Sequence, residues 1–468
     1  MKLPSVSIPV GMGAVVAFQA LTLLLTFVMP GFFQALAAAL ALVSVGLRGL
    51  PTLFRQITMP TLLVVLTVGL FLKTGSDLLF IVLVVFLFVI IQTKDLPRWF
   101  KITMSALLVL VAIPIAGFIN TFLLELSIQI GIYAAMALGL NVVVGMAGLL
   151  DLGYAAFFAI GAYTWAIFGS PQAAAFIQHY TPLGGLWFYP FMFVAIATTA
   201  ITGILIGLPA LRLRGDYLAI VTLGLGEVIR VLANNLDHPV NLTNGPQGIT
   251  PVGRPPIDWF RDAFDAVGVH LTKATDYPFF FYLLVLAVIA IVIMVNVNLS
   301  RSKFGRAWVA LREDEIAAKA MGIPMVKTKL MAFATGAAFS GAMGVLFAAQ
   351  RGFVSPESFT LLASITILGM VVLGGMGSIT GVVLGVAALT LLNLDILKSF
   401  SGYLNALRQG SGSLLGFHFK DLPTQVDPAK FERLVFGLVL ILMMIFRPEG
   451  LIPERRHKIE AHQEEVQP

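Results

Sequence analysis

Apolar runs close to the length of a membrane span repeat along the whole chain. A helix needs about 20 apolar residues to cross a bilayer. Several runs are shorter than that, and two of them, Pro60–Leu72 and Leu361–Leu373, are candidates for half-helices or re-entrant segments. The pattern predicts at most about fourteen segments, of which about ten to twelve are complete spans. The segments are Val10–Met29, Phe32–Leu47, Pro60–Leu72, Leu78–Ile91, Thr103–Asn120, Leu123–Val144, Tyr154–Phe168, Phe188–Leu208, Tyr217–Ala233, Pro278–Leu299, Lys329–Ala349, Leu361–Leu373, Ile379–Leu392 and Leu434–Phe446.

Composition sets the fold class. Of the 468 residues, 58% are hydrophobic and 12% are charged, and the mean hydropathy is +0.93. Soluble domains are roughly 45–50% apolar and about 25% charged. A soluble fold is therefore excluded, and we expect an all-α, polytopic transmembrane helix bundle with interrupted and short helices. The net charge of +6 does not indicate nucleic-acid binding, and the absence of cysteine excludes disulfides and thiolate metal sites.

The distribution of positive charge predicts how the segments cross the membrane. If the N-terminus starts in the cytoplasm and the segments alternate, about two thirds of the 30 lysines and arginines fall on the inner side. Arg212, Arg214 and the loop from Arg301 to Lys329 are among them. Both termini are then cytoplasmic, and the first apolar run is an uncleaved span because it is longer than a signal-peptide core.

The chain divides into three predicted parts. Residues 1–101 form an N-terminal membrane extension of about four spans. Residues 102–450 form a core that is rich in glycine and interrupted helices, and they include a charged loop over residues 301–327. Residues 451–468 form a charged cytoplasmic tail.

The loop over residues 301–327 predicts a short amphipathic helix at residues 306–321. Glu315 and Lys319 have the i,i+4 spacing of a helical ion pair. Gly322 suits a left-handed helix cap, and Pro324 prevents continuation. The alanine-rich surface favours docking to another protein, because small side chains allow a close approach. The alternative is a helix that lies on lipid headgroups, which would bury bulky apolar residues.

Glycines and polar residues at membrane depth form a second set of candidates. Glycine permits helix breaks and close packing of helices. Glu125, Gln129 and Asn141 follow one helical stripe, where lipid would penalise them. The set can line a central pathway through broken helices. The alternatives are helix packing for the glycines, an ion pair with Arg230 for Glu227, and a position at the outer interface for Glu125. The candidates are Glu125, Gln129, Asn141, Gly148, Gly153, Glu227, Gly374, Gly375 and Gly377.

Several separated motifs occur along the chain: Asn141–Tyr154, Leu208–Tyr217, Leu242–Ile249, Gly305–Gly322, Gly352–Phe359 and Phe446–Leu451. In this order they resemble the LivM-type permeases of branched-chain amino acid ABC importers. The resemblance covers about residues 110–453, and the first hundred residues resemble the extra membrane region of some of these permeases.

The resemblance implies a function and a set of partners. The chain is expected to be the membrane-spanning permease subunit of a bacterial importer in the inner membrane that moves leucine, isoleucine and valine. A LivH-type second permease, two ABC ATPase subunits and a periplasmic substrate-binding protein would complete it. The loop corresponds by position to the family's coupling loop, which docks the ATPases. Its candidate residues are Gly305, Arg306, Ala310, Arg312, Glu313, Asp314, Ala317, Ala318 and Gly322.

Missing motifs agree with a permease that is not itself an enzyme. No Gly-Lys dipeptide occurs, so the sequence lacks a phosphate-binding loop, and ATP is expected on the partner subunits. No metal or other cofactor is expected. Another small polar substrate, such as urea, a short amide or another amino acid, stays open, as does an ion-coupled secondary transporter. An intramembrane enzyme would need a nucleophile–base pair, which the sequence does not offer.

The orientation can be tested with reporter fusions. A reporter active only in the cytoplasm should be active when fused after Lys458 and silent when inserted within Asn244–Thr250. The opposite pair of results would overturn the orientation predicted from the lysine and arginine distribution.

Overall fold

The computed structural model describes most of the chain from residue 77 to residue 452. The described ranges are 77–93, 96–177, 181–210, 216–266, 271–399 and 428–452, with short pieces at 59–60, 62–64, 66–67, 268, 401–402, 413–414 and 417–418. Several predictions lie outside these residues. They concern Val10–Met29, Phe32–Leu47, most of Pro60–Leu72, Arg212, Arg214 and the tail after Ile452.

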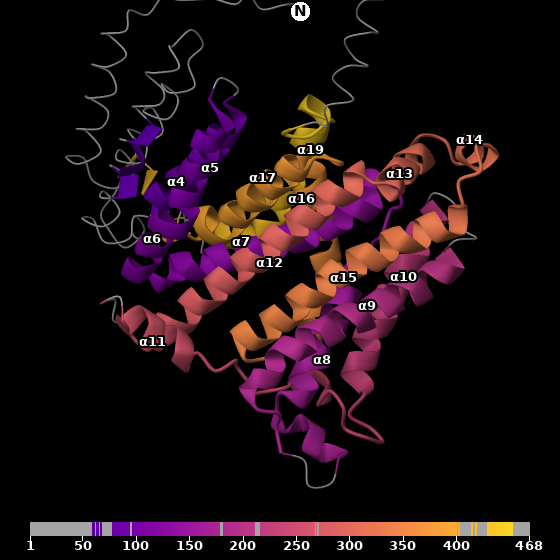
Figure 1. Cartoon of the computed structure of the whole chain (residues 1–468), viewed down its shortest axis with the longest axis horizontal. Helices are drawn as coiled ribbons and strands as arrows, with labels where there is room; N and C mark the ends of the chain where they lie inside the picture. The colour runs from indigo at the N-terminus through magenta and orange to yellow at the C-terminus, as the bar shows by residue number, and fades with distance from the viewer. Residues whose placement is uncertain are drawn as a thin grey trace, which may run out of the picture. The chain divides into compact units, whose positions relative to one another are not determined.

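The described chain is almost entirely helical (Figure 1). Its α-helices are α4 (Asp77–Gln92), α5 (Arg98–Leu107), α6 (Ile113–Ile119), α7 (Thr121–Asn141), α8 (Tyr154–Phe168), α9 (Phe188–Ala210), α10 (Asp216–Asn235), α11 (Asp258–Ala266), α12 (Asp276–Arg301), α13 (Lys303–Glu313), α14 (Glu315–Ala320), α15 (Met325–Arg351), α16 (Leu361–Gly374), α17 (Ile379–Leu391) and α19 (Glu432–Phe446). Shorter turns are η1 (Leu108–Ala112), η2 (Val142–Met146), η3 (Pro171–Ala175), η4 (Gly185–Trp187), η5 (Gly245–Gln247), η6 (Pro356–Phe359), η7 (Leu392–Ile396) and η10 (Pro428–Phe431). Among the described residues, the two-residue strands β1 (Ser413–Leu414) and β2 (Phe417–His418) pair antiparallel.

Membrane-length helices confirm the predicted fold class. Among the described residues, eight helical segments are long and apolar enough to cross a bilayer, and two more apolar helices are shorter. The short helix Tyr154–Phe168 has the predicted bounds. The apolar run that begins at Leu361 belongs to a 19-residue segment, Pro356–Gly374. The chain is therefore an all-α, polytopic transmembrane bundle.

The chain separates into two compact units. The first contains residues 1–127, 272–279 and 394–400, and the second contains residues 128–271, 280–393 and 401–468. Within the first unit, Gly117 packs directly against Leu124, and the rings of Phe118 and Phe279 lie 5.0 Å apart. The contacts described below lie within the second unit.

Glycine allows the helices of the second unit to approach closely. Helix α15 packs along α8 and α9 (Figure 1). At the α8–α15 contact, a side chain on Gly161 would collide with the backbone of Gly341. At the α9–α15 contact, Gly203 faces Ala337. Backbone approach of this kind supplies van der Waals contact where the hydrophobic effect cannot drive association between helices.

The outer faces of the helices are apolar. On α9, Phe193, Ile201 and Leu205 are 67%, 57% and 59% exposed, whereas buried residues make up 83% of the most apolar window of Thr121–Met146. Exposed apolar side chains are costly in water and are the expected surface toward lipid. Helix α9 therefore belongs to the lipid-facing rim, and α7 to the interior.

The glycine contact between α8 and α15 can be tested with one chemical change at two positions. Gly161→Ala should lower the melting temperature of the detergent-purified protein, because its methyl group would meet the backbone of Gly341 and overpacking costs about 1–3 kcal/mol. Gly224→Ala on α10 is the control, because a methyl group there meets no atom within 4 Å. Equal melting temperatures for the two variants would contradict the packing argument.

Candidate functional site

The charged loop forms two helices instead of the single helix predicted over residues 306–321. Asp314 is extended (φ −154°, ψ 111°) and separates α13 from α14. Its carboxylate accepts hydrogen bonds from the backbone N–H groups of Ile316 (2.7 Å) and Ala317 (3.0 Å). The prediction of a continuous helix was wrong because aspartate, a favoured N-cap residue, starts a new helix at this position.

The end of the loop follows the prediction. Gly322 adopts φ +80°, and the N–H of Ile323 donates to the carbonyl of Ala318 at 3.1 Å, as in a left-handed cap. Glu315, which was expected to pair with Lys319, instead forms an ion pair with Lys329 of α15 at 2.8 Å. This ion pair joins α14 to α15.

Helix α13 is anchored in the apolar core of the second unit. Trp308 is fully buried, and its indole N–H donates to the carbonyl of Thr328 at 2.8 Å. Leu311 is 6% exposed and packs in one cluster with Val143 and Phe333. The helix is therefore held against η2 and α15, and movement of α13 must displace packed side chains.

The predicted loop residues divide between the interior and the surface. Gly305 and Ala318 are buried within this chain, Ala310 and Arg312 are half-buried, and Asp314 acts as the cap described above. The exposed members are Arg306, Glu313, Ala317 and Gly322. Ile316 and Met321, which are 71% and 83% exposed, add an apolar surface to α14 beside Ala317.

Arg312 connects the loop to the first helix break. Its Nη1 donates to the carbonyl of Gly145 at 2.5 Å, and Gly145 lies in η2, a π-helical turn at the end of α7. Gly148 adopts φ +69°, and a Cβ atom there would lie 2.7 Å from Cγ of Arg312. Glycine is required at residue 148 both for its backbone conformation and for its contact with Arg312.

Asn141 joins the first helix break to a second one, residues 375–378 between α16 and α17. Its side-chain oxygen accepts a hydrogen bond at 2.8 Å from the backbone N–H of Gly377, and Asn141 is fully buried. We refer to Asn141, Gly145, Gly148, Arg312 and Gly377 as the junction. Members of both predicted sets, Arg312 from the loop and Asn141, Gly148 and Gly377 from the pathway set, meet there.

The C-terminal segment holds the other two predicted glycines. Leu451 and Ile452 donate backbone hydrogen bonds to the carbonyls of Leu373 (2.9 Å) and Gly374 (3.1 Å). Gly375 adopts φ +111°, a conformation that favours glycine, and lies against the carbonyl of Ile452. This segment therefore satisfies carbonyl groups that are freed where α16 ends.

A buried carboxylate orders the start of α8. The N–H of Gly153 donates to Oδ1 of Asp151 at 2.9 Å, and the N–H of Leu152 donates to the hydroxyl of Thr222 at 3.1 Å. Burial raises the pKa of Asp151, which lies between the spans, to about 6, although the hydrogen bond from Gly153 lowers it. Gly153 itself lies against the Thr222 carbonyl and Gly226, which brings α8 close to α10.

The remaining predicted polar residues lie away from the junction. Gln129 is 7% exposed and accepts a hydrogen bond from Arg351 at 3.1 Å. Glu227 forms the expected ion pair with Arg230 at 2.8 Å, and Arg230 also reaches Glu357 at 3.3 Å.

The sequence prediction missed Asp151 and Arg351 as site residues. Asp151, two residues before Gly153, was a recognisable turn signal, because an aspartate side chain accepts a hydrogen bond from the backbone two residues on. Arg351 directly precedes the left-handed cap Gly352, but nothing local indicated its partner. The last pathway candidate, Glu125, is exposed on the part of α7 that belongs to the first unit.

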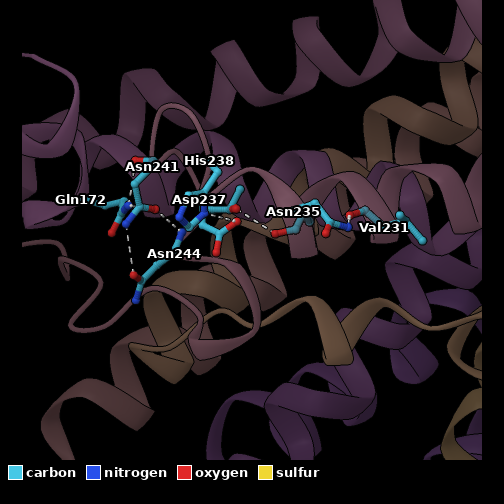
Figure 2. A network of polar contacts seen from close by, with 9 residues as sticks. Gln172, Val231, Asn235, Asp237, His238, Asn241 and Asn244 are labelled. Atoms are coloured by element: carbon cyan, nitrogen blue, oxygen red, sulfur yellow. Dashed lines mark hydrogen bonds and ion pairs between the residues drawn. The ribbon is translucent and has the colours of Figure 1, made fainter.

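A polar network orders the loop that follows α10 (Figure 2). Gln172 donates to both the carbonyl and the side-chain oxygen of Asn241 at 2.9 and 2.8 Å. Asn244, with φ +58°, donates its own N–H to the Asn241 side chain at 2.8 Å. The hydrogen bond from His238 lowers the pKa of Asp237. The loop thus has a defined shape that depends on side-chain amides.

Together, the polytopic bundle, the paired helix breaks and the anchored loop define a membrane-embedded transport subunit. The family model for the permease component of the branched-chain amino acid transport system matches residues 122–444, and the chain belongs to this family.

Curated relatives carry the same description. The chain is similar to the high-affinity branched-chain amino acid transport system permease protein LivM of Salmonella typhimurium, with 38% identity over 77% of this chain and 76% of that protein. The LivM protein of Escherichia coli gives the same identity and coverage. A probable LivM protein of Methanocaldococcus jannaschii is 26% identical over 69% of this chain and 91% of that protein. No solved structure matches the chain.

The junction predicts a defect in energy coupling. Arg312→Ala leaves the Gly145 carbonyl without this donor, and an unsatisfied buried partner costs about 1–3 kcal/mol. We expect the variant to insert and assemble normally, but to lose most of its transport per ATP hydrolysed in the reconstituted transporter. Arg433→Ala, an exposed arginine of α19, is the control. Unchanged transport per ATP in Arg312→Ala would exclude a coupling role.

Proposed function

We propose that this chain is the membrane-spanning permease subunit of a bacterial ABC importer and translocates leucine, isoleucine and valine across the inner membrane. The family match and the LivM relatives support the substrate class. The junction is the observation that carries the mechanism, because an anchored loop with an exposed apolar helix is hydrogen-bonded directly to a helix break through Arg312.

The loop over residues 301–327 is the site where ATPase subunits dock. Its exposed residues Ile316, Ala317 and Met321 give the ATPases an apolar contact. The buried residues Trp308 and Ala318 hold the loop to this chain. A displacement of α14 is transmitted to α15 through the Glu315–Lys329 ion pair. It is transmitted to η2 through the hydrogen bond from Arg312 to the Gly145 carbonyl. Alternating access follows when ATP closes the ATPase pair and these contacts reorient the helices.

The family match and the LivM relatives support a set of partners. A LivH-type second permease shares the pathway, two ABC ATPase subunits bind and hydrolyse ATP, and a periplasmic substrate-binding protein delivers the amino acid. This chain binds no cofactor or metal and has no catalytic residues of its own. Residues 1–101 form a membrane extension, residues 102–450 form the permease core, and residues 451–468 form the tail.

The docking loop also sets the orientation. ATPase subunits act in the cytoplasm, so the loop is cytoplasmic, and the lysine and arginine distribution supports cytoplasmic termini. The loop ordered by Asn241 and Asn244 then faces the periplasm, because the membrane-length helix α12 separates it from the docking loop.

Deletion of this chain should abolish high-affinity uptake of leucine, isoleucine and valine at low external concentration, because the pathway would lose one of its two permeases. Uptake of the three radiolabelled amino acids by cells with and without the chain measures this. Re-expression of the intact chain should restore uptake.

Normal uptake of all three amino acids in the deletion strain, together with loss of urea or amide uptake, would assign a different substrate. Uptake that survives ATP depletion but collapses with the ion gradient would identify a secondary transporter instead.

A further inference from the structure

A cavity of about 430 Å³ lies in the second unit, away from the junction. It opens among α7, α8, α15, α16 and the segment after α15. Small-molecule sites commonly have volumes of about 300–1,000 Å³. The cavity therefore has room for one small ligand.

The lining of the cavity combines polar and apolar side chains. Gln129, Tyr133 and Arg351 contribute polar groups, whereas Phe158, Phe347 and Ile367 are apolar. The rings of Phe158 and Phe347 are in contact, with centroids 5.1 Å apart. A ligand that matches this lining is a small molecule with a polar end and a compact apolar body.

The charges of the lining residues indicate which polar group of a ligand the cavity can bind. Among the lining residues that the structure describes, Arg351 carries a charge and no carboxylate is present. Its guanidinium already donates to Gln129 at 3.1 Å, and guanidinium has further N–H groups suited to bidentate binding of a carboxylate. Gln129 is 7% exposed, so this hydrogen bond positions Arg351 at the cavity.

We propose that this cavity is a binding site for the transported amino acid within the permease, which we call the substrate station. Arg351 binds the substrate carboxylate there, and the apolar residues Phe158, Phe347 and Ile367 contact its branched side chain. The proposal rests on the proposed function for its substrate class and adds the residues that contact the substrate. Gln129 is a positioning residue, because it acts through Arg351.

The chain contains no cysteine, so the alkylation rate of a single introduced cysteine measures the accessibility of one known position. Ser358 is an exposed residue that lines the cavity. In the complete transporter, without binding protein, leucine should slow alkylation of Ser358→Cys by a charged thiol reagent. The slowing should be about tenfold at a leucine concentration about ten times the dissociation constant, because occupancy excludes the reagent. Leucinol, which lacks the carboxylate, should not protect.

Two matched variants identify the carboxylate partner. Arg351→Gln in the Ser358→Cys background should abolish protection by leucine. Arg254→Gln should retain it, because Arg254 contacts the Gln350 carbonyl (3.4 Å) and does not line the cavity.

A cysteine away from the cavity controls for the alkylation reaction itself. The side chain of His238 is 88% exposed on another loop. The thiol of His238→Cys should therefore react at the same rate with and without leucine.

A change of cavity size gives a second measurement that does not involve Arg351. Ala363→Leu narrows the cavity and should lower the ratio of leucine to valine uptake at least about threefold, since one methylene in an apolar pocket changes selectivity by about tenfold or more. The control is the neighbouring residue Leu362, which is 40% exposed and does not line the cavity. Leu362→Phe should therefore leave the ratio of leucine to valine uptake unchanged.

The proposal is overturned if leucine does not slow alkylation of Ser358→Cys, if leucinol protects as well as leucine, or if Arg351→Gln keeps its protection. Leucine uptake by the unmodified transporter distinguishes a failure of this proposal from a failure of the proposed function. Uptake without protection removes this station and leaves the proposed function intact. Absence of branched-chain amino acid uptake removes the proposed function itself.

Discussion

Where a membrane helix ends, its last backbone carbonyl groups lose their helical partners, and these groups need partners within the protein when they are buried. The second unit meets this constraint with contacts between distant segments. Asn141 binds the N–H of Gly377, and Arg312 binds the carbonyl of Gly145. Leu451, in the segment after α19, donates its N–H to the carbonyl of Leu373. The two helix breaks, the loop over residues 301–327 and the segment after α19 are therefore linked by hydrogen bonds that a movement must replace.

Features fixed by neighbouring residues were predictable from the sequence. The bounds of Tyr154–Phe168 were correct because glycine flanks the apolar run on both sides. The cap at Gly322 was correct because glycine followed by Ile323 and Pro324 is a local signal. The split at Asp314 was also a local signal, but helical periodicity on both sides of it outweighed the capping preference in the prediction.

Features that depend on tertiary contacts could not be predicted. Ala318 was chosen for its small size, yet only the packed structure shows that its methyl group lies inside this chain whereas Ala317 is exposed. Glu315 has a partner at helical spacing in Lys319, but it pairs with Lys329. The hydrogen bond from Arg351 to Gln129 spans 222 residues of sequence. Periodicity places residues on a face and does not say which face meets which.

Helix α7 carries both the junction and the proposed substrate station. Gln129 and Asn141 are separated along its axis by about 18 Å at 1.5 Å per residue. The helix is buried over most of this length, and dense packing transmits a displacement instead of absorbing it. The π-helical turn η2 interrupts regular hydrogen bonding just beyond Asn141, so the end of α7 that contacts Arg312 is the part most easily rewound. A loop movement that changes the Arg312 contact therefore acts on the helix whose Gln129 positions Arg351, and α7 connects the proposed ATPase contact to the proposed substrate station.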